Sequence, residues 1–432
     1  MTERLSPDLV RRTVEGRTSE LVALTQDLVR IPTVNPPGDA YADCAEYLAR
    51  YLNRAGFTVQ RFRAEGTPGD SERYPRINIV ARREGARPGP TVHFNGHIDV
   101  VAAGHGWTFD PFGAELVEGR IYGRGTCDMK GGLAAAIIAS QAYIALRPDH
   151  DGAIEISGTV DEESGGFGGV AHLASLGLFS KPRVDHVIIP EPLNKDRICL
   201  GHRGVWWANI ETFGRQAHGS MPFLGDCAVR HMGAVLQRFE RDLFPALDAR
   251  HTAMPVVPEG ARSSTLNINA IHGGAPADAD GFDGLPAPNV PDRCEITIDR
   301  RFLIEEDIGT VKGEVRALLE GLKEERAGFD YAVADLMEVL PTMTDAHAPV
   351  VRAVENAVQD VLGRPAEHVV SPGTYDQKHI ARIGHLHDCI AYGPGILDLA
   401  HQPDEFIVVE DMVESARVMC HALDTLLHPT NL

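Results

Sequence analysis

The sequence is organised around a short apolar run that ends in a histidine and an aspartate, TVHFNGHID (91–99). Similar β-like runs stand on either side of it, and helical patterns separate them. The other β-like runs are residues 77–82, 153–160 and 186–190, and the helical patterns are 21–28, 41–52, 129–144 and 170–176. Apolar strands that alternate with helices are typical of a mostly parallel sheet covered by helices on both faces. We therefore predict an α/β fold for this part of the chain.

From about residue 203 the pattern changes to alternating polar and apolar residues. The alternating runs are 206–214, 265–274 and 293–302, with helical patterns at 228–239 and 308–322. This order predicts an α+β sandwich with helices on one face of an antiparallel sheet. Its segment 275–288, rich in Ala, Asp, Gly and Pro, is expected to be an exposed loop. Helices at 350–362 and 409–427 return to the first pattern. The prediction is one α/β domain, residues 1–204 and 339–432, interrupted by an inserted domain, residues 205–338.

Composition narrows the class of protein. The chain has 432 residues, with 41 Lys or Arg and 61 Asp or Glu, for a formal net charge of −20. An acidic protein repels phosphate backbones and anionic lipids, so we expect neither nucleic acid nor a membrane as partner. No secretory signal is evident at the start and no apolar run is long enough for a bilayer span. Seven scattered cysteines without CxxC pairs indicate reduced thiols and predict a cytoplasmic protein.

Metal-type ligands follow successive strands of the predicted sheet. These residues are His97, Asp128 in GRGTCDMKGG, Glu162 and Glu163 in GTVDEESGG, Glu191 in IIPEP, and His401 in LAHQPDEF. Each alone has an ordinary explanation, such as a helix N-cap for Asp128. Because the carboxyl ends of parallel strands meet at one edge of a sheet, we expect these side chains to converge. The sequence therefore predicts a metal site.

The residue types indicate which metal chemistry this site supports. Two histidines and several carboxylates suit Zn²⁺, with Co²⁺ or Mn²⁺ as alternatives. A single catalytic zinc needs fewer ligands, so the set fits two ions about 3.5–4 Å apart that share a carboxylate. Asp128 is the best candidate for the shared ligand, and Asp99 is placed to orient His97. Of the neighbours Glu162 and Glu163, one can bind metal while the other moves a proton.

The chain resembles a known metallopeptidase family, which includes acetylornithine deacetylase, succinyl-diaminopimelate desuccinylase, aminoacylase and glutamate carboxypeptidase. The resemblance covers nearly the whole chain. It rests on RIPTVNPPG (30–38), FNGHIDVV, GRGTCDMKGG, DEESGG, PEP, RQAHGSMP (215–222), NINAIHGG, DRRF, SPGTYD (371–376) and GPG followed by AHQPDE. It implies that His97 and Glu191 hold one zinc and that Glu163 and His401 hold the other. Asp128 would bridge the two ions, Glu162 would be the general base, and Asp99 would orient His97. It also implies a cis peptide after Asp128.

The same resemblance implies roles outside the metal ligands. The inserted domain would be a lid that also forms a homodimer. His218 would stabilise the oxyanion, and Arg301 would bind the α-carboxylate of the substrate through a bidentate contact. Arg300 is the competing candidate because neighbours on a strand face opposite ways, and the Asp299-x-Arg301 spacing favours Arg301. Asn267, Gly373 and Thr374 would line the substrate site.

The predicted function is a two-zinc hydrolase that cleaves the amide bond of an N-acyl amino acid. A dipeptidase or carboxypeptidase of the same family is the nearest alternative, because it would share every metal ligand. A non-catalytic member that only binds metal or ligand, and an unrelated zinc aminopeptidase, are two further alternatives. Desuccinylase-like members resemble this chain but carry a small residue and a glycine where it has Tyr375 and Gln377. We therefore expect the loop around Tyr375–Lys378 to select the substrate.

Overall fold

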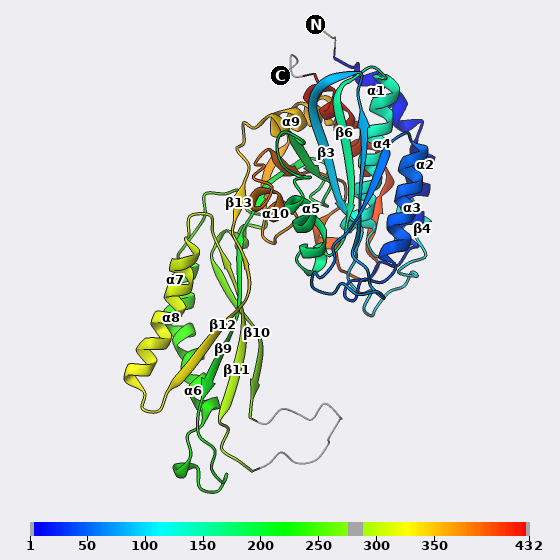
Figure 1. The fold of residues 1–432 in the computed structure, drawn as a ribbon. Coiled ribbons are helices and arrows are strands. Elements are labelled where there is room, and N and C mark those ends of the chain that lie inside the picture. The colour runs from blue at the N-terminus through cyan, green and yellow to red at the C-terminus, as the bar shows by residue number, and fades with distance from the viewer. Residues whose placement is uncertain (1–3, 275–287, 429–432) are drawn as a thin grey trace. The chain divides into compact units, whose positions relative to one another are not determined.

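The computed structural model describes residues 4–274 and 288–428, so the loop predicted at 275–288 lies outside the described residues except for Pro288 (Figure 1). The chain divides into two compact units. The first comprises Met1–Gly201, Met343–Val369 and Tyr375–Leu432, and the second comprises His202–Thr342 and Val370–Thr374. An α/β unit is thus interrupted in sequence by a second unit.

The first unit is built on a nine-stranded sheet with the order β1-β2-β6-β3-β7-β15-β8-β13, in which β14 also pairs with β8. The four strands β6, β3, β7 and β15 run parallel, and the pairs β1–β2, β2–β6 and β15–β8 are antiparallel. The predicted largely parallel sheet is therefore confirmed. The strands are β1 (Thr58–Arg63), β2 (Ile77–Glu84), β3 (Arg87–His97), β6 (Asp151–Thr159), β7 (His186–Ile189), β8 (Arg197–His202), β13 (Thr342–Met343), β14 (Glu367–Ser371) and β15 (Cys389–Ala391).

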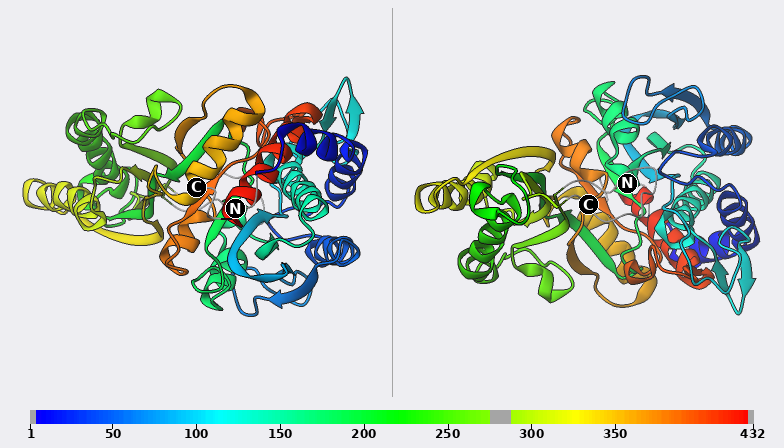
Figure 2. Two further views of the ribbon diagram at one scale, coloured as in Figure 1. Left: turned by 90° about the horizontal axis from the view of Figure 1, so that it is seen from above. Right: turned by 90° about the horizontal axis from the view of Figure 1, so that it is seen from below.

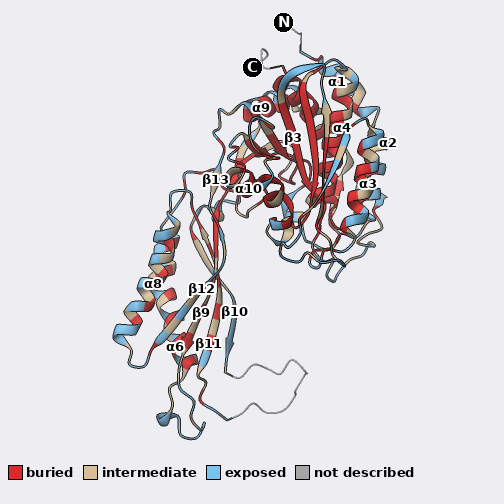
Figure 3. Ribbon diagram, viewed as in Figure 1, coloured by how far each residue is buried: buried red, intermediate tan, exposed pale blue. Residues whose placement is uncertain are grey.

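Helices cover this sheet and bury its centre. α3 packs on β1 and β2, α4 and α11 pack on β3, and α9 packs on β7 and β15. Consecutive residues of β3 from Thr91 to His97 are buried, so both faces of this strand are covered (Figure 3). The helices are α1 (Pro7–Glu15), α2 (Thr18–Val29), α3 (Tyr41–Arg54), α4 (Gly131–Leu146), α5 (His172–Ser175), α9 (Pro349–Leu362), α10 (Gln377–Arg382) and α11 (Val409–Leu426). The first and last of them, blue and red in Figure 2, pack against each other.

Helix α4 is apolar on all sides because it lies inside the unit. Its residues from Gly131 to Ala139 are all buried. Among the described residues, the segment Thr126–Leu146 is the one helical stretch long and apolar enough to cross a membrane, and 78% of its most apolar window is buried inside the protein. This burial is that of a core helix. A small separate sheet consists of β4 (Glu115–Val117), β5 (Arg120–Tyr122) and β16 (Phe406–Val408), and β16 contacts the segment Thr126–Lys130 that precedes α4.

The second unit is a four-stranded antiparallel sheet with the order β10-β11-β9-β12. Its strands are β9 (Gly204–Phe213), β10 (Thr265–Gly273), β11 (Arg293–Phe302) and β12 (Asp330–Val339), and its helices are α6 (Ala228–Arg238), α7 (Phe244–Asp248) and α8 (Ile308–Glu325). Alternate residues of β9, Trp206, Ala208 and Ile210, are buried with apolar residues of α6 and α8 in one core. The period-2 pattern of this strand therefore marks the face that the helices cover.

Candidate metal centre

The end of β3 supplies the first histidine of the site. His97 is 1% exposed, and its Nδ1 lies 3.0 Å from the backbone oxygen of Asp99 and 3.6 Å from the Asp99 carboxylate. The nearer acceptor for an N–H at Nδ1 is therefore the carbonyl, which leaves Nε2 facing the site. The Asp99 carboxylate instead accepts the backbone N–H groups of Glu162 and Glu163, each at 3.2 Å. Asp99 thus ties the loop after β6 to the end of β3.

Asp128 lies in a tight loop before α4, not inside the helix. Its φ and ψ of −118° and 98° are not helical, and the peptide between Asp128 and Met129 is cis, as the resemblance implied. The Glu405 carboxylate accepts the backbone N–H groups of Gly125, Cys127 and Asp128 at 2.9, 2.9 and 3.2 Å. The loop is therefore held by a buried acid from a distant part of the chain. One carboxylate oxygen of Asp128 lies 3.1 Å from His97 Nε2.

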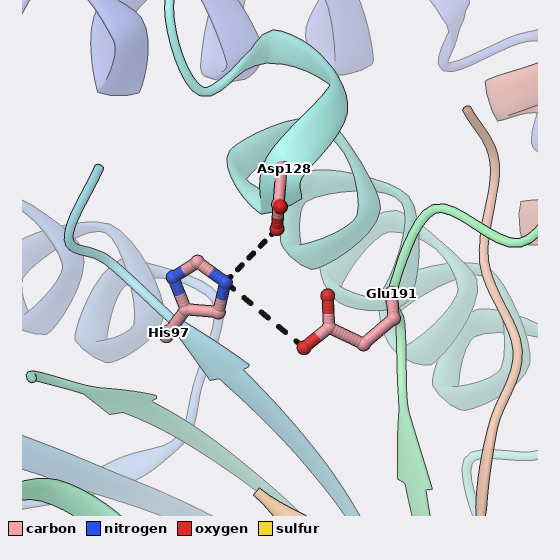
Figure 4. Close-up of side chains that lie close together, drawn as sticks. All are labelled: His97, Asp128 and Glu191. Atoms are coloured by element: carbon pink, nitrogen blue, oxygen red, sulfur yellow. Dashed lines mark hydrogen bonds and ion pairs between the residues drawn. The ribbon is translucent and has the colours of Figure 1, made fainter. Parts of the chain in front are cut away.

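Glu191 follows β7 and completes a first group of three. Its Oε1 lies 4.0 Å from His97 Nε2, and Figure 4 shows His97, Asp128 and Glu191 pointing toward one another. Two glycines make room for the backbone of Pro190, the residue before Glu191. A Cβ at Gly132 would lie 1.9 Å from the Pro190 carbonyl oxygen, and one at Gly393 would lie 2.4 Å from it. Only glycine allows this close approach of α4 and the β15 end to the Glu191 loop.

A second group of three shares Asp128 with the first. His401 Nε2 lies 3.1 Å from Glu163 Oε1 and 3.5 Å from the second carboxylate oxygen of Asp128. In each group, His97–Asp128–Glu191 and Asp128–Glu163–His401, one ligand atom per residue lies within 4.8 Å of the others. The structure therefore brings together the five side chains predicted as ligands, with Asp128 between the other two pairs.

The electrostatics of the two groups favour the binding of cations. Burial raises the pKa of Glu191 well above its usual value, and the nearby charge of Asp128 adds to the effect. Burial also raises the pKa of Glu163 to about 7, although the hydrogen bond with His401 opposes this shift. Crowded, buried carboxylates are stabilised when a positive charge lies among them. Two imidazole nitrogens and three carboxylates are also a donor set that Zn²⁺, Co²⁺ and Mn²⁺ accept, so the residues present fit the predicted metal.

Glu162 lies beside the two groups and belongs to neither of them. Its neighbour Glu163 points to His401, and its own Oε1 lies 3.1 Å from Lys378 Nζ. Both alternatives were open from the sequence, and the structure distinguishes the two side chains. Glu163 has the position of a ligand, and Glu162 has that of an acid next to the centre.

Comparison with known proteins places this geometry in a family. Residues 93–425 match the model of the family described as Peptidase family M20/M25/M40. The chain belongs to this family. It is a metal-dependent amidohydrolase, and the predicted family is confirmed.

Relatives of this M20/M25/M40 chain match it over nearly its whole length. A succinyl-diaminopimelate desuccinylase of Methylorubrum extorquens is 30% identical over 427 residues, covering 93% of this chain and 98% of that protein. One of Pseudoalteromonas atlantica is 29% identical over 415 residues, covering 94% and 99%. The solved structure of a dipeptidase of Saccharomyces cerevisiae has a TM-score of 0.77 at 18% identity and covers 98% of both chains. This last likeness shows that the M20/M25/M40 fold is shared.

The other predicted site residues of this M20/M25/M40 chain belong to the second unit. His218 is exposed and its Nδ1 lies 2.7 Å from Ser220 Oγ, and Asn267 is exposed and donates to Asn269 at 2.7 Å. Gly373 and Thr374 are half-buried in the segment Val370–Thr374. The roles of these four residues stay predictions.

Arg300 and Arg301 differ clearly in their surroundings within the second unit. The Arg300 side chain is 0% exposed and binds Glu306 at 2.8 Å, so it belongs to the interior. The Arg301 side chain is 23% exposed, and its Nε and Nη2 bind the Asp299 carboxylate at 2.7 and 2.9 Å. Arg301 is thus the more exposed of the two and is held by Asp299, and its role in substrate binding stays a prediction.

Sequence reasoning missed Glu405 and the contact of Lys378. Both are charged residues close to recognised motifs, but nothing in a single sequence marks a charge as buried. The side chains of Tyr375–Lys378 are buried, and the role of this loop in substrate choice stays a prediction. Tyr375 Oη lies 2.6 Å from Gln377 Oε1, and the Gln377 amide donates to the carbonyl oxygens of Leu200 and Cys389 at 3.1 and 2.7 Å. In this chain the polar groups of Tyr375 and Gln377 are therefore used in contacts inside the protein.

Proposed function

We propose that this protein is a two-metal hydrolase that removes the acyl group from N-acyl amino acids. The observation that carries the proposal is the pair of three-residue groups that share Asp128, with Glu162 beside them. The relatives named succinyl-diaminopimelate desuccinylase support this substrate class, since they match this chain over more than nine-tenths of its length. An N-succinyl amino acid is therefore the first substrate to test, and an N-acetyl amino acid is the second.

The proposed cofactor is a pair of zinc ions, with cobalt or manganese as substitutes. His97 and Glu191 would hold one ion, Glu163 and His401 would hold the other, and Asp128 would bridge them. Zinc ions bound here would polarise the carbonyl of the substrate and lower the pKa of water.

The protein's own residues would carry the proton transfers. Glu162 takes a proton from the attacking water and delivers it to the amide nitrogen as that nitrogen leaves. His218 donates a hydrogen bond to the carbonyl oxygen while negative charge builds on it. Arg301 binds the α-carboxylate with the donors that Asp299 leaves available, and Asn267, Gly373 and Thr374 line the same substrate site.

The second unit has a separate proposed role as lid and dimerisation domain. In this proposal His218 and Arg301, which belong to this unit, act with the ligands of the first unit, so the units would close on a substrate during the reaction. The proposed assembly is a homodimer, and the proposed compartment is the cytoplasm. Cys44, Cys127, Cys389 and Cys420 are buried free thiols, which suit a reducing compartment.

One substrate screen tests the proposal against its rivals. The purified chain, loaded with Zn²⁺, Co²⁺ or Mn²⁺, is given N-succinyl and N-acetyl amino acids, dipeptides and longer peptides, and the released amine is measured. Release from the N-acyl amino acids is the expected result. Cleavage confined to peptides with a free amino terminus would instead indicate a dipeptidase or aminopeptidase.

The Glu162→Gln variant tests the assignment of the base. Because the amide cannot accept the proton of water, turnover should fall by about 10²-fold or more while the metal stays bound. Near-normal turnover of this variant with its full metal content would remove Glu162 from the proposed role.

A further inference from the structure

We infer that Lys378 is a positioning residue for Glu162, because its ammonium group holds the Glu162 carboxylate in the orientation that proton transfer needs. The inference rests on the proposed function, in which Glu162 is the base. It adds a residue from α10, more than two hundred positions away in the sequence.

The contact between the two residues is short and shielded from water. Lys378 Nζ lies 3.1 Å from Glu162 Oε1, with the side chains 4% and 12% exposed. From the other end, the Glu162 backbone N–H is held by the Asp99 carboxylate at 3.2 Å. Glu162 is thus fixed at its main chain by one residue and at its carboxylate by another. A buried pair of this kind restricts the rotamers of both side chains.

Lys378 is itself placed by the strand that carries His97. The residue before α10 is Asp376, and its Oδ2 accepts a hydrogen bond from Asn95 Nδ2 at 2.9 Å. Asn95 lies on β3, two residues before His97, so the same strand positions both Lys378 and the proposed ligand His97. Gln377 adds bonds to Leu200 and Cys389, which fix the start of α10 to neighbouring strands.

The charges around Lys378 keep it positive. Burial lowers its pKa, but the carboxylates of Glu162 and Asp376 outweigh burial and raise that pKa above the usual value. This ammonium group therefore places a positive charge directly against the Glu162 carboxylate. A lysine that is 4% exposed and paired in this way is also poorly placed to bind a substrate directly.

The test is a double-mutant cycle on the zinc-loaded full chain, with an N-acyl amino acid that the wild type cleaves. Lys378→Met should lower kcat by about 10²-fold, with KM within about threefold of the wild type, because orientation and not binding is lost. Lys378→Arg should restore most of kcat. Lys378→Met added to Glu162→Gln should cause no further loss, because the lysine acts through Glu162. Zinc content should stay at the wild-type value throughout.

Other outcomes would overturn the inference. A raised KM with unchanged kcat would place Lys378 on the substrate, and a further loss in the double variant would show that it acts elsewhere. Should Lys378→Met fail to fold, Lys378→Arg and the double variant, which removes both charges, still decide the question. Lys312→Met is the matched control, since Lys312 pairs with Asp335 and Glu338 in the second unit and should leave kcat unchanged. Failure of the proposed function is seen separately, in a wild type that releases no amine or an active Glu162→Gln variant.

Discussion

Arg124 and Glu405 form a buried ion pair, with 2.5 Å between Arg124 Nη1 and Glu405 Oε2 and side chains 2% and 0% exposed. The pair connects the loops that carry two of the proposed metal ligands, Asp128 and His401. Glu405 accepts three backbone N–H groups of the Asp128 loop, and Arg124 donates to the carbonyl oxygens of His401 and Gln402, each at 3.3 Å. The pair therefore links the Asp128 loop to the His401 loop through backbone groups of both.

Loss of the Glu405 charge should weaken metal binding. Glu405→Gln keeps the shape of the side chain but weakens its bonds to Arg124 and to the Asp128 loop, so zinc affinity should fall by roughly 10–100-fold. Titration calorimetry with Zn²⁺ measures this change. Asp424→Asn is the control, because it weakens another buried pair of the first unit, Arg147–Asp424 at 3.1 Å. Equal zinc affinity in both variants and the wild type would contradict the role of Glu405.

A methyl group at Gly393 should disturb the Glu191 loop. Its Cβ would lie 2.4 Å from the Pro190 carbonyl oxygen and 2.8 Å from that of Glu191, so the backbone must move. We expect Gly393→Ala to lower the free energy of unfolding by about 1–3 kcal/mol and to reduce zinc affinity. Gly321→Ala is the control, since no atom lies within 4 Å of the added Cβ in α8 and stability should be kept or raised. Urea unfolding of the two variants distinguishes them, and equal stability would count against the close packing described.

The neighbours Arg300 and Arg301 should respond differently to the same substitution. Arg300→Met removes one of the two arginines that pair with Glu306, and Arg250 still binds that carboxylate at 3.0 Å, so the free energy of unfolding should fall by about 1.5–3 kcal/mol. Arg301→Met should leave stability nearly unchanged and raise KM by about tenfold or more, because a charged hydrogen bond to the substrate is lost. Thermal unfolding measures the stability of both variants, and steady-state kinetics measures the KM of Arg301→Met. An unchanged KM in Arg301→Met would exclude Arg301 from substrate binding.

Acid should destabilise the protein in part through His421. Burial lowers the pKa of this histidine in the folded state from its usual 6.5, although the charges of Asp360 and Asp424 oppose the shift. The unfolded chain then binds the proton more readily, so this contribution to stability is present above pH 6.5 and is lost as the pH falls below it. We therefore expect the free energy of unfolding, measured with urea at pH 7.5 and 5.5, to fall less between these two pH values in His421→Gln than in the wild type. An identical loss in both proteins would show that His421 is not involved.

The convergence of the five side chains proposed as ligands could be predicted from the sequence because their positions follow from local rules. His97 and Glu191 each follow an apolar strand, and parallel strands bring their carboxyl ends together. Imidazoles and carboxylates at that edge then indicate a metal without further information. The choice between Glu162 and Glu163 needed either the family resemblance or the structure, because adjacent residues on a loop have no fixed period.

The contacts of Glu405 and Lys378 that support the site could not be predicted from the sequence, and the reason is physical. Glu405 reaches Gly125 across 280 positions, and Lys378 reaches Glu162 across 216. Each is a charged residue that would ordinarily be exposed, and its burial depends on how distant loops pack. The same holds for Tyr375 and Gln377, whose polar groups bind within the interior. Short strands such as β15 were also too brief for periodicity to identify.

The most direct test of the account is the number of zinc ions bound by one chain. The protein is stripped with chelator, reconstituted with Zn²⁺, desalted and analysed for metal by mass spectrometry. The shared position of Asp128 predicts two equivalents per chain in the wild type, and fewer than two after His401→Ala with the first group intact. One equivalent or none in the wild type would contradict a two-metal centre.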